Sequence, residues 1–167
     1  MSLRVMEERG IGMVEVLIAL LVMSIGVLGY ADLQLRALGS SEDAFVRSQA
    51  MAIAQDAVER ISANRSGVPT YSDGANWPVA VQQNRPANWM ECVDNICGSA
   101  QMAQWDIDQL AWMAGDLLPG GRIDAVDCQG SVALCVRVAW NEDAPPDCEN
   151  AAGAVSNRDC VVLEVVP

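Results

Sequence analysis

Two residue types are missing from this chain of 167 residues: it has no histidine, and all ten of its basic residues are arginine. Histidine is the commonest general base and a frequent metal ligand, so its absence excludes histidine-based triads and histidine-ligated zinc. Acidic residues number 22, which gives a formal net charge of -12. Nucleic-acid binding needs clustered positive charge, so we expect no nucleic-acid partner. We predict a non-enzymatic protein with no cofactor and no metal.

Cysteine is absent from the first half of the chain. All six cysteines lie in the second half, at Cys92, Cys97, Cys128, Cys135, Cys148 and Cys160. Structural zinc sites need closely spaced CxxC-type pairs, and none of these spacings has that form. An even number of cysteines in an exported domain is typical of disulfides formed in an oxidising compartment. We therefore predict disulfides rather than a metal site.

A long apolar run is present only near the N-terminus. Residues 1–10, MSLRVMEERG, are short and charged, and residues 11–30 carry Glu15 as their only charged side chain. The run is long enough to cross a bilayer core, which needs about 20 apolar residues. No small-residue cleavage site follows it, so we expect the segment to be retained. A plain membrane anchor is the alternative, but it leaves Glu15 unexplained, since a charge at the centre of a spanning helix costs about 2.5–3.5 kcal/mol.

The sequence from Gly10 to Glu15, GIGMVE, resembles the processing site of type IV prepilins. In that family a membrane peptidase cleaves after the glycine and methylates the new N-terminal residue, and the fifth residue of the mature chain is glutamate. The resemblance implies cleavage between Gly10 and Ile11, N-methylation of Ile11, and a role for Glu15 in assembly. Glu15 would pair with the ammonium group of Ile11 in a neighbouring subunit, which would neutralise both charges inside an apolar filament core.

Three positions depart from the commonest pattern of this family. Ile11 and Gly12 stand where many members have phenylalanine and threonine, and Asp32 stands where major pilins often have a helix-kinking proline. The absence of that proline indicates a minor rather than a major pilin.

Residues 32–63 contain no proline and are expected to continue the helix. Residues 64–74 are rich in turn formers and are predicted to end it. The sequence Gly39-Ser40-Ser41 allows a bend, and Ser40 or Ser41 could cap a second helical segment. Apolar residues recur at steps of three or four, which is typical of one buried helical face. They are Val46, Ala50, Ile53, Ala57 and Ile61.

One more helix pattern occurs in the remaining residues. Residues 75–104 lack a clear period and are interpreted as an irregular loop, in which Trp77 and Trp89 are expected to anchor the core. Residues 106–118 are expected to form a short helix that begins at Asp106 as its N-cap and stops at PGG. Capping and solvation, rather than acid–base chemistry, explain the acidic side chains of this segment. These are Asp106, Asp108 and Asp116.

Three strand patterns follow, at residues 122–128, 132–140 and 160–166. Between the first two, Gln129-Gly130 would make a tight turn that pairs Cys128 with Ser131 and places Cys135 opposite Asp124. A disulfide between Cys128 and Cys135 would instead need a wider loop of six residues. Both alternatives stay open.

For the six cysteines we favour a sequential pairing. It joins Cys92 to Cys97, Cys128 to Cys135, and Cys148 to Cys160. The last pair would close a C-terminal loop, within the polar connection at residues 141–159, like the disulfide-bounded loop of many pilins.

The order of elements from residue 106 to residue 140 resembles that of PilV-type minor pilins. A short helix ending in LPGG is followed by antiparallel strands through a valine-rich stretch that ends in Trp140. The resemblance implies a subunit of a priming complex at the pilus tip. Its partners would be the major pilin, other minor pilins, the prepilin peptidase/methyltransferase and a tip-associated adhesin.

The predicted fold is α+β: a long N-terminal α-helix, membrane-spanning and then amphipathic, packed on a small antiparallel β-sheet head with a short extra helix and disulfides. The expected divisions are a leader at residues 1–10, a transmembrane and filament-core helix at 11–31, an amphipathic continuation at 32–64, and a disulfide-bonded head at 65–167. We expect a single-pass inner-membrane protein with a periplasmic head that then enters a pilus on the cell surface.

The expected function is that of a minor pilin which initiates pilus assembly and supports adhesion and twitching motility. A minor pseudopilin of a type II secretion system is the alternative, since it carries the same N-terminal signal. A membrane-anchored periplasmic enzyme or binding module would need a concave site with convergent polar groups, and the sequence offers no nucleophile with a base.

Overall fold

The computed structural model of this chain describes residues 12–85, 91–93, 95–148, 155 and 157–166. Its internal contacts divide the chain into two units, Met1–Asp43 and Ala44–Pro167. Gly10, Ile11 and Trp89 lie outside the described residues, so what we expect of them stays a prediction.

The described part of the first unit is helical from Met13 onward. It is the N-terminal part of α1 (Met13–Ala63), whose helical backbone continues without a break through Gly39, Ser40 and Ser41. The possibility that a serine caps a second helical segment here is therefore wrong. The segment has no proline and is rich in leucine, methionine and alanine, which favour helix, so one glycine and two serines do not end it.

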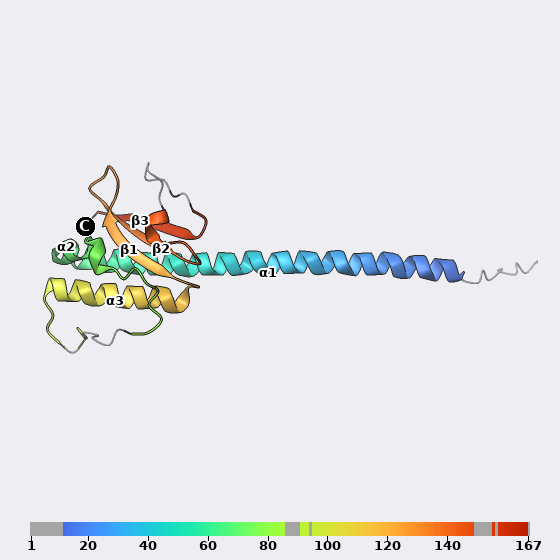
Figure 1. Cartoon of the computed structure of the whole chain (residues 1–167), viewed down its shortest axis with the longest axis horizontal. Helices are drawn as coiled ribbons and strands as arrows, with labels where there is room; N and C mark the ends of the chain where they lie inside the picture. Colours follow the sequence, from blue (N-terminus) through green and yellow to red (C-terminus); the bar gives the residue numbers. More distant parts are fainter. Residues whose placement is uncertain (1–11, 86–90, 94, 149–154, 156, 167) are drawn as a thin grey trace, which may run out of the picture. The chain divides into compact units, whose positions relative to one another are not determined.

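The second unit begins with the C-terminal part of α1, which forms one wall of the hydrophobic core. Figure 1 shows α3 (Ser99–Leu117) and the strands alongside this part of α1. The predicted apolar stripe is confirmed, because its members are buried in, or half-buried against, one core: Val46, Ala50, Ile53, Ala57 and Ile61.

Three short helices follow the end of α1 at Ala63, where the turn-forming residues were predicted to end it. They are η1 (Arg65–Gly67), α2 (Val68–Tyr71) and η2 (Gly74–Asn76). Trp77 comes next and is 3% exposed, and its indole Nε1 donates to the backbone oxygen of Tyr71 at 2.7 Å. The expectation that Trp77 anchors the core is confirmed.

The helix α3 begins at Ser99 rather than at Asp106, so the predicted irregular loop was too long. Its N-cap is Gly98, whose backbone N–H donates to Gln101 Oε1 at 3.0 Å. Glycine has no side chain with which to cap a helix, so the true start carries no strong sequence signal. Asp106 resembles a cap only because an acidic residue precedes an apolar stripe.

The helix α3 ends where predicted, just before Pro119-Gly120-Gly121. Gly120 has a φ of 64°, in the left-handed region that favours glycine. At Gly121 a Cβ would lie 2.0 Å from the carbonyl oxygen of Ala114. Glycine at both positions lets the chain turn tightly into the sheet.

The three predicted strands are confirmed, each to within two residues. They are β1 (Arg122–Asp127), β2 (Leu134–Ala139) and β3 (Cys160–Val165). They form an antiparallel sheet in the order β1-β2-β3. Together with the helices and disulfides, the sheet confirms the α+β fold class.

The β1–β2 connection shows that one of the two hairpin hypotheses, which placed Cys135 opposite Asp124, is wrong. The N–H of Ser131 donates to the carbonyl oxygen of Cys128 at 3.4 Å, so a turn does form at Gln129-Gly130. However, the ladder resumes only at Leu134, and Cys135 lies opposite Val126 rather than Asp124. Cys128 is joined to Cys135 by a disulfide, which the wider connection allows.

The two faces of the sheet have different surroundings. One face contributes Ile123, Ala125, Val136, Val138 and Val161 to the main core shared with α1 and α3. On the other face Cys135 packs with Cys128, while Ala139 packs with Cys148 and Cys160. Cys148 ends η3 (Pro145–Cys148), so one short helix and one loop cover this face.

Candidate functional site

Glu15 lies in the first turn of α1 and is exposed. Its backbone N–H donates to the carbonyl oxygen of Gly12 at 2.9 Å. A carboxylate in the first helical turn is favourable because the helix dipole is positive there. Glu15 is thus placed at the N-terminal end of the helix, and its role in assembly stays a prediction.

The surface of α1 around and beyond Glu15 is apolar and uncovered. The exposed large side chains include Val14, Leu17, Ile18, Leu20, Leu21, Val22, Met23, Ile25, Val27 and Leu28. By length and composition this helix could cross a membrane, with a mean hydropathy of 2.2 over its most apolar stretch. Water does not solvate such a surface at low cost, so the surface is suited to contact with lipid or with other protein chains.

In the second unit a buried carboxylate joins three helices. Asp106 on α3 is 4% exposed, and Arg60 of α1 donates from Nη1 to its Oδ1 at 2.9 Å. The hydroxyl of Tyr71, at the end of α2, donates to Asp106 Oδ2. Arg60 also donates from Nε to Asp56 at 3.0 Å and from Nη1 to Gln109 at 2.7 Å. Because every partner is satisfied, the cluster fixes these helices against one another.

Burial and hydrogen bonding change the acidity of this cluster. Burial raises the pKa of Tyr71 strongly, and the hydrogen bond to Asp106 raises it further. Burial lowers the pKa of Arg60, but its hydrogen bonds to Asp56 and Asp106 outweigh burial and raise it overall. Arg60 and Tyr71 therefore hold their protons more firmly than free side chains do.

Asp106 was explained by capping, and that explanation is wrong. The helix begins earlier, so Asp106 lies within it, on the buried face that also carries Ala103 and Leu110. The spacing of three and four residues from Ala103 and Leu110 was visible in the sequence, but the partners Arg60 and Tyr71 are far away in the chain. Asp116 is exposed, as solvation predicts.

A second buried ion pair lies in the sheet, on the face away from the main core. Arg137 donates to Asp124 from Nε at 2.8 Å and from Nη2 at 2.5 Å, with 11% and 13% of the two side chains exposed. Burial raises the pKa of Asp124, and Arg137 partly offsets this effect. This bidentate pair fixes β1 against β2.

The six cysteines form three disulfides in sequential order: Cys92–Cys97, Cys128–Cys135 and Cys148–Cys160. Glu164 brings a carboxylate oxygen within 4.8 Å of the sulfurs of Cys128 and Cys135. Metal ions bind thiolates, and both sulfurs are already bonded to each other. We therefore assign this group to the disulfide rather than to a metal.

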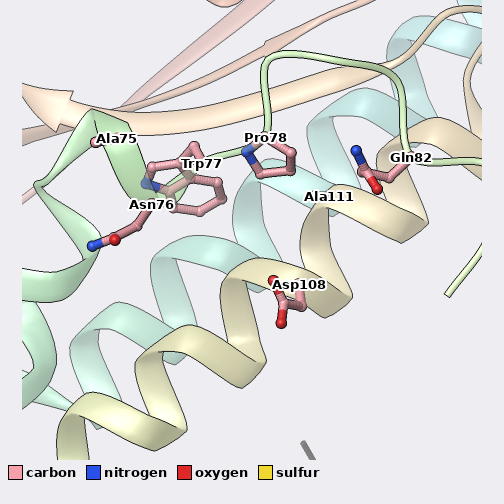
Figure 2. Close-up of a pocket in the computed structure, with 7 residues that line it drawn as sticks. All are labelled: Ala75, Asn76, Trp77, Pro78, Gln82, Asp108 and Ala111. Carbon is pink, nitrogen blue, oxygen red and sulfur yellow. The ribbon is translucent and has the colours of Figure 1, made fainter. Parts of the chain in front are cut away.

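Two hollows lie on the described part of the second unit. The larger, of about 430 Å³, is lined by Arg60, Asn64 and Asp106 among others. Arg60 donates to Asp106, and Asn64 donates to the backbone oxygen of Ser99, which also lines this hollow. The smaller, of about 190 Å³, lies between Trp77 and Pro78 on one side and α3 on the other. Figure 2 shows Gln82 and Asp108 at its rim.

Comparison with known proteins gives one match. Residues 32–108 match the family model described as Tt1218-like, type IV pilin Tt1218, over a little under half of the chain. No curated protein and no solved structure gives a significant match.

The match falls on the segment that contains the buried cluster of Arg60, Tyr71 and Asp106. It ends at residue 108, so it overlaps only the start of the region, residues 106–140, in which we expected a PilV-type likeness. That finer assignment stays a prediction. The match and the long apolar N-terminal helix are consistent with a type IV pilin-like protein.

Proposed function

We propose that this chain is a minor pilin of a type IV pilus, which acts in the tip complex that initiates assembly and supports adhesion and twitching motility. The observation that carries the proposal is the uncovered apolar surface of α1, with Glu15 as its only charge between Gly12 and Tyr30. It occurs in a chain that matches a type IV pilin family. A surface of this kind suits a helix that lies first in lipid and then among the helices of neighbouring subunits.

Processing precedes assembly in this proposal. The prepilin peptidase cleaves after Gly10 and methylates Ile11, while α1 anchors the chain in the inner membrane with its head in the periplasm. Gly10→Val should therefore leave an uncleaved precursor in the membrane fraction, because a branched side chain replaces the glycine at the scissile bond. Mass spectrometry of the purified chain detects this, and a mature chain beginning at Ile11 in the variant would contradict the proposed site.

The head acts without catalysis and contacts the major pilin, other minor pilins and a tip adhesin. Its disulfides and ion pairs support this role, because a subunit that initiates a filament must keep one rigid shape. No cofactor is required.

Deletion of the gene tests the pilus against a secretion pseudopilus. We expect loss of surface pili and of twitching, with exoprotein secretion retained, and rescue by the intact chain. Loss of secretion with pili retained would contradict the pilus assignment and support the pseudopilin alternative.

A further inference from the structure

The smaller hollow has an unusual polar rim. It is formed where the segment from Trp77 to Gln82 passes over α3, and Figure 2 shows Trp77 and Pro78 above it and Asp108 below it. The backbone of Gln82 lies so close to α3 that a Cβ at Gly115 would be 2.4 Å from its carbonyl oxygen. One end of the hollow is therefore closed by backbone, while Asn76, Gln82 and Asp108 line it with polar side chains.

Gln82 and Asp108 each have an acceptor oxygen that accepts no hydrogen bond from the described residues. Gln82 Nε2 donates to the backbone oxygen of Ala80 at 3.1 Å, and Asp108 Oδ1 accepts from Gln104 at 3.2 Å. Among the described residues no donor reaches Gln82 Oε1 or Asp108 Oδ2. The hollow thus offers an amide oxygen and a carboxylate oxygen as acceptors.

Asp108 brings a negative charge to this hollow. Asp108 has no cationic partner among the described residues, and burial raises its pKa, with the hydrogen bond from Gln104 as a partial offset. The nearest arginine along the segment is Arg85, which lies over the ring of Trp112 at 5.3 Å and faces Glu91 at 3.9 Å. A half-buried carboxylate without a counter-charge favours a bound cation.

We propose that this hollow receives the guanidinium group of an arginine side chain from a neighbouring, different subunit of the filament. The volume of about 190 Å³ is below the roughly 300 Å³ at which sites for small-molecule ligands begin, but it suits the end of one side chain. A guanidinium presents several donors in a plane, which suits a hollow lined by both a carboxylate and an amide oxygen. The inference rests on the proposed function, because it requires a neighbouring subunit.

Charge decides which neighbour fits. This chain has a net charge of -12, so two copies repel each other, whereas a subunit with a basic surface is attracted to the hollow. The occupant is therefore a basic region of another pilin rather than a second copy of this chain.

A titration of the full chain in detergent with methylguanidinium tests the hollow without any filament. We expect saturable NMR shifts of the Trp77 indole and the Gln82 side-chain amide. Asp108→Asn should weaken this binding by about tenfold or more, because a charge-assisted hydrogen bond is lost. The matched control, Asp116→Asn, changes an exposed aspartate of the same helix and should bind as the wild type does.

Three results would overturn the inference: no saturable shift in the wild type, equal binding by Asp108→Asn, or the same shifts produced by calcium at lower concentration than methylguanidinium. In cells, incorporation of Asp108→Asn into pili at the wild-type level would overturn the docking role. None of these results changes the expected outcome of the deletion experiment. The proposed function is therefore tested independently of this hollow.

Discussion

Asp106 shows how a single residue can be misjudged from its neighbours in sequence. An acidic residue before an apolar stripe predicts a helix cap, and the prediction was local. In the folded chain Asp106 lies inside α3 and is bound by Arg60 and Tyr71, which come from earlier helices. Nothing in the sequence around Asp106 specifies these partners, because they meet only when α1, α2 and α3 pack together.

Removal of Arg60 should destabilise the head strongly. In Arg60→Met the buried carboxylate of Asp106 loses its cation, and breaking a buried ion pair costs about 3–5 kcal/mol. Urea unfolding followed by circular dichroism measures the change. The control, Arg65→Met, alters an exposed arginine and should change the free energy of unfolding by less than about 0.5 kcal/mol. Equal effects of the two substitutions would contradict the role of the cluster.

Alkaline pH should weaken the head through Tyr71. The pKa of Tyr71 is raised in the folded chain, whereas an unfolded tyrosine ionises near a pKa of about 10. Above about pH 10 the unfolded state loses a proton that the folded state keeps, so the free energy of unfolding falls as the pH rises. Below that pH the contribution is fully present.

The measurement compares unfolding at about pH 8 and about pH 11. Tyr30→Phe serves as the background, because the chain has only two tyrosines. Adding Tyr71→Phe should remove most of the alkaline loss. The chain has no free cysteine to initiate disulfide exchange at high pH. An alkaline loss that persists without Tyr71 would refute this assignment.

At the scale of the elements, sequence patterns predicted the middle of each helix and strand better than its ends. The three strands were recognisable from their β-branched residues, and the stripe on α1 from its helical period. The start of α3 was missed because its cap is a glycine, and the β1–β2 connection was undecided because both a turn and a disulfide were compatible with the sequence. Packing selects between such alternatives, and it is not a local property.

Gly115 should be needed where the segment from Trp77 to Gln82 crosses α3. A Cβ at this position would meet the backbone of Gln82, which cannot rotate away, so Gly115→Ala should cost about 1–3 kcal/mol by overpacking. At Gly39 of α1 nothing lies within 4 Å of an added Cβ, and Gly39→Ala should favour the helix by about 1 kcal/mol. Thermal unfolding in detergent measures both, and the explanation fails if the two substitutions change stability in the same direction.

For the ion pair of the sheet, losing one partner should destabilise the head more than replacing both partners with apolar residues. Arg137→Met alone leaves Asp124 buried and uncompensated and should cost about 3–5 kcal/mol. Replacing Asp124 with leucine in the same chain should recover most of this loss, because a well-packed apolar pair is often as stable as a buried ion pair. A double variant no more stable than Arg137→Met would contradict this view.

At the scale of the whole molecule, the fold class was predictable because its parts carry separate signals. An apolar run, a helical stripe, strand patterns and paired cysteines each indicate one part of an α+β pilin-like fold. The predicted head began at residue 65, whereas the internal contacts group the chain from Ala44 onward with the sheet, since this part of α1 shares its core.

The two supports for a pilin lie in different parts of the chain. The processing motif is at the N-terminus, while the family match begins at residue 32 and covers the helices around Asp106. The motif therefore adds independent support. What the sequence could not supply is the neighbouring subunit, whose surface determines what the head contacts.

The most direct test of the central claim is the amount of Glu15→Ala chain in purified pili. We predict that this variant is cleaved after Gly10 and methylated, yet is absent from sheared filaments, because Glu15 no longer pairs with a neighbour's terminal ammonium group. Asp32→Ala, which changes another exposed acidic residue of α1, should be incorporated normally and serves as the control. Incorporation of Glu15→Ala at the wild-type level would contradict the account.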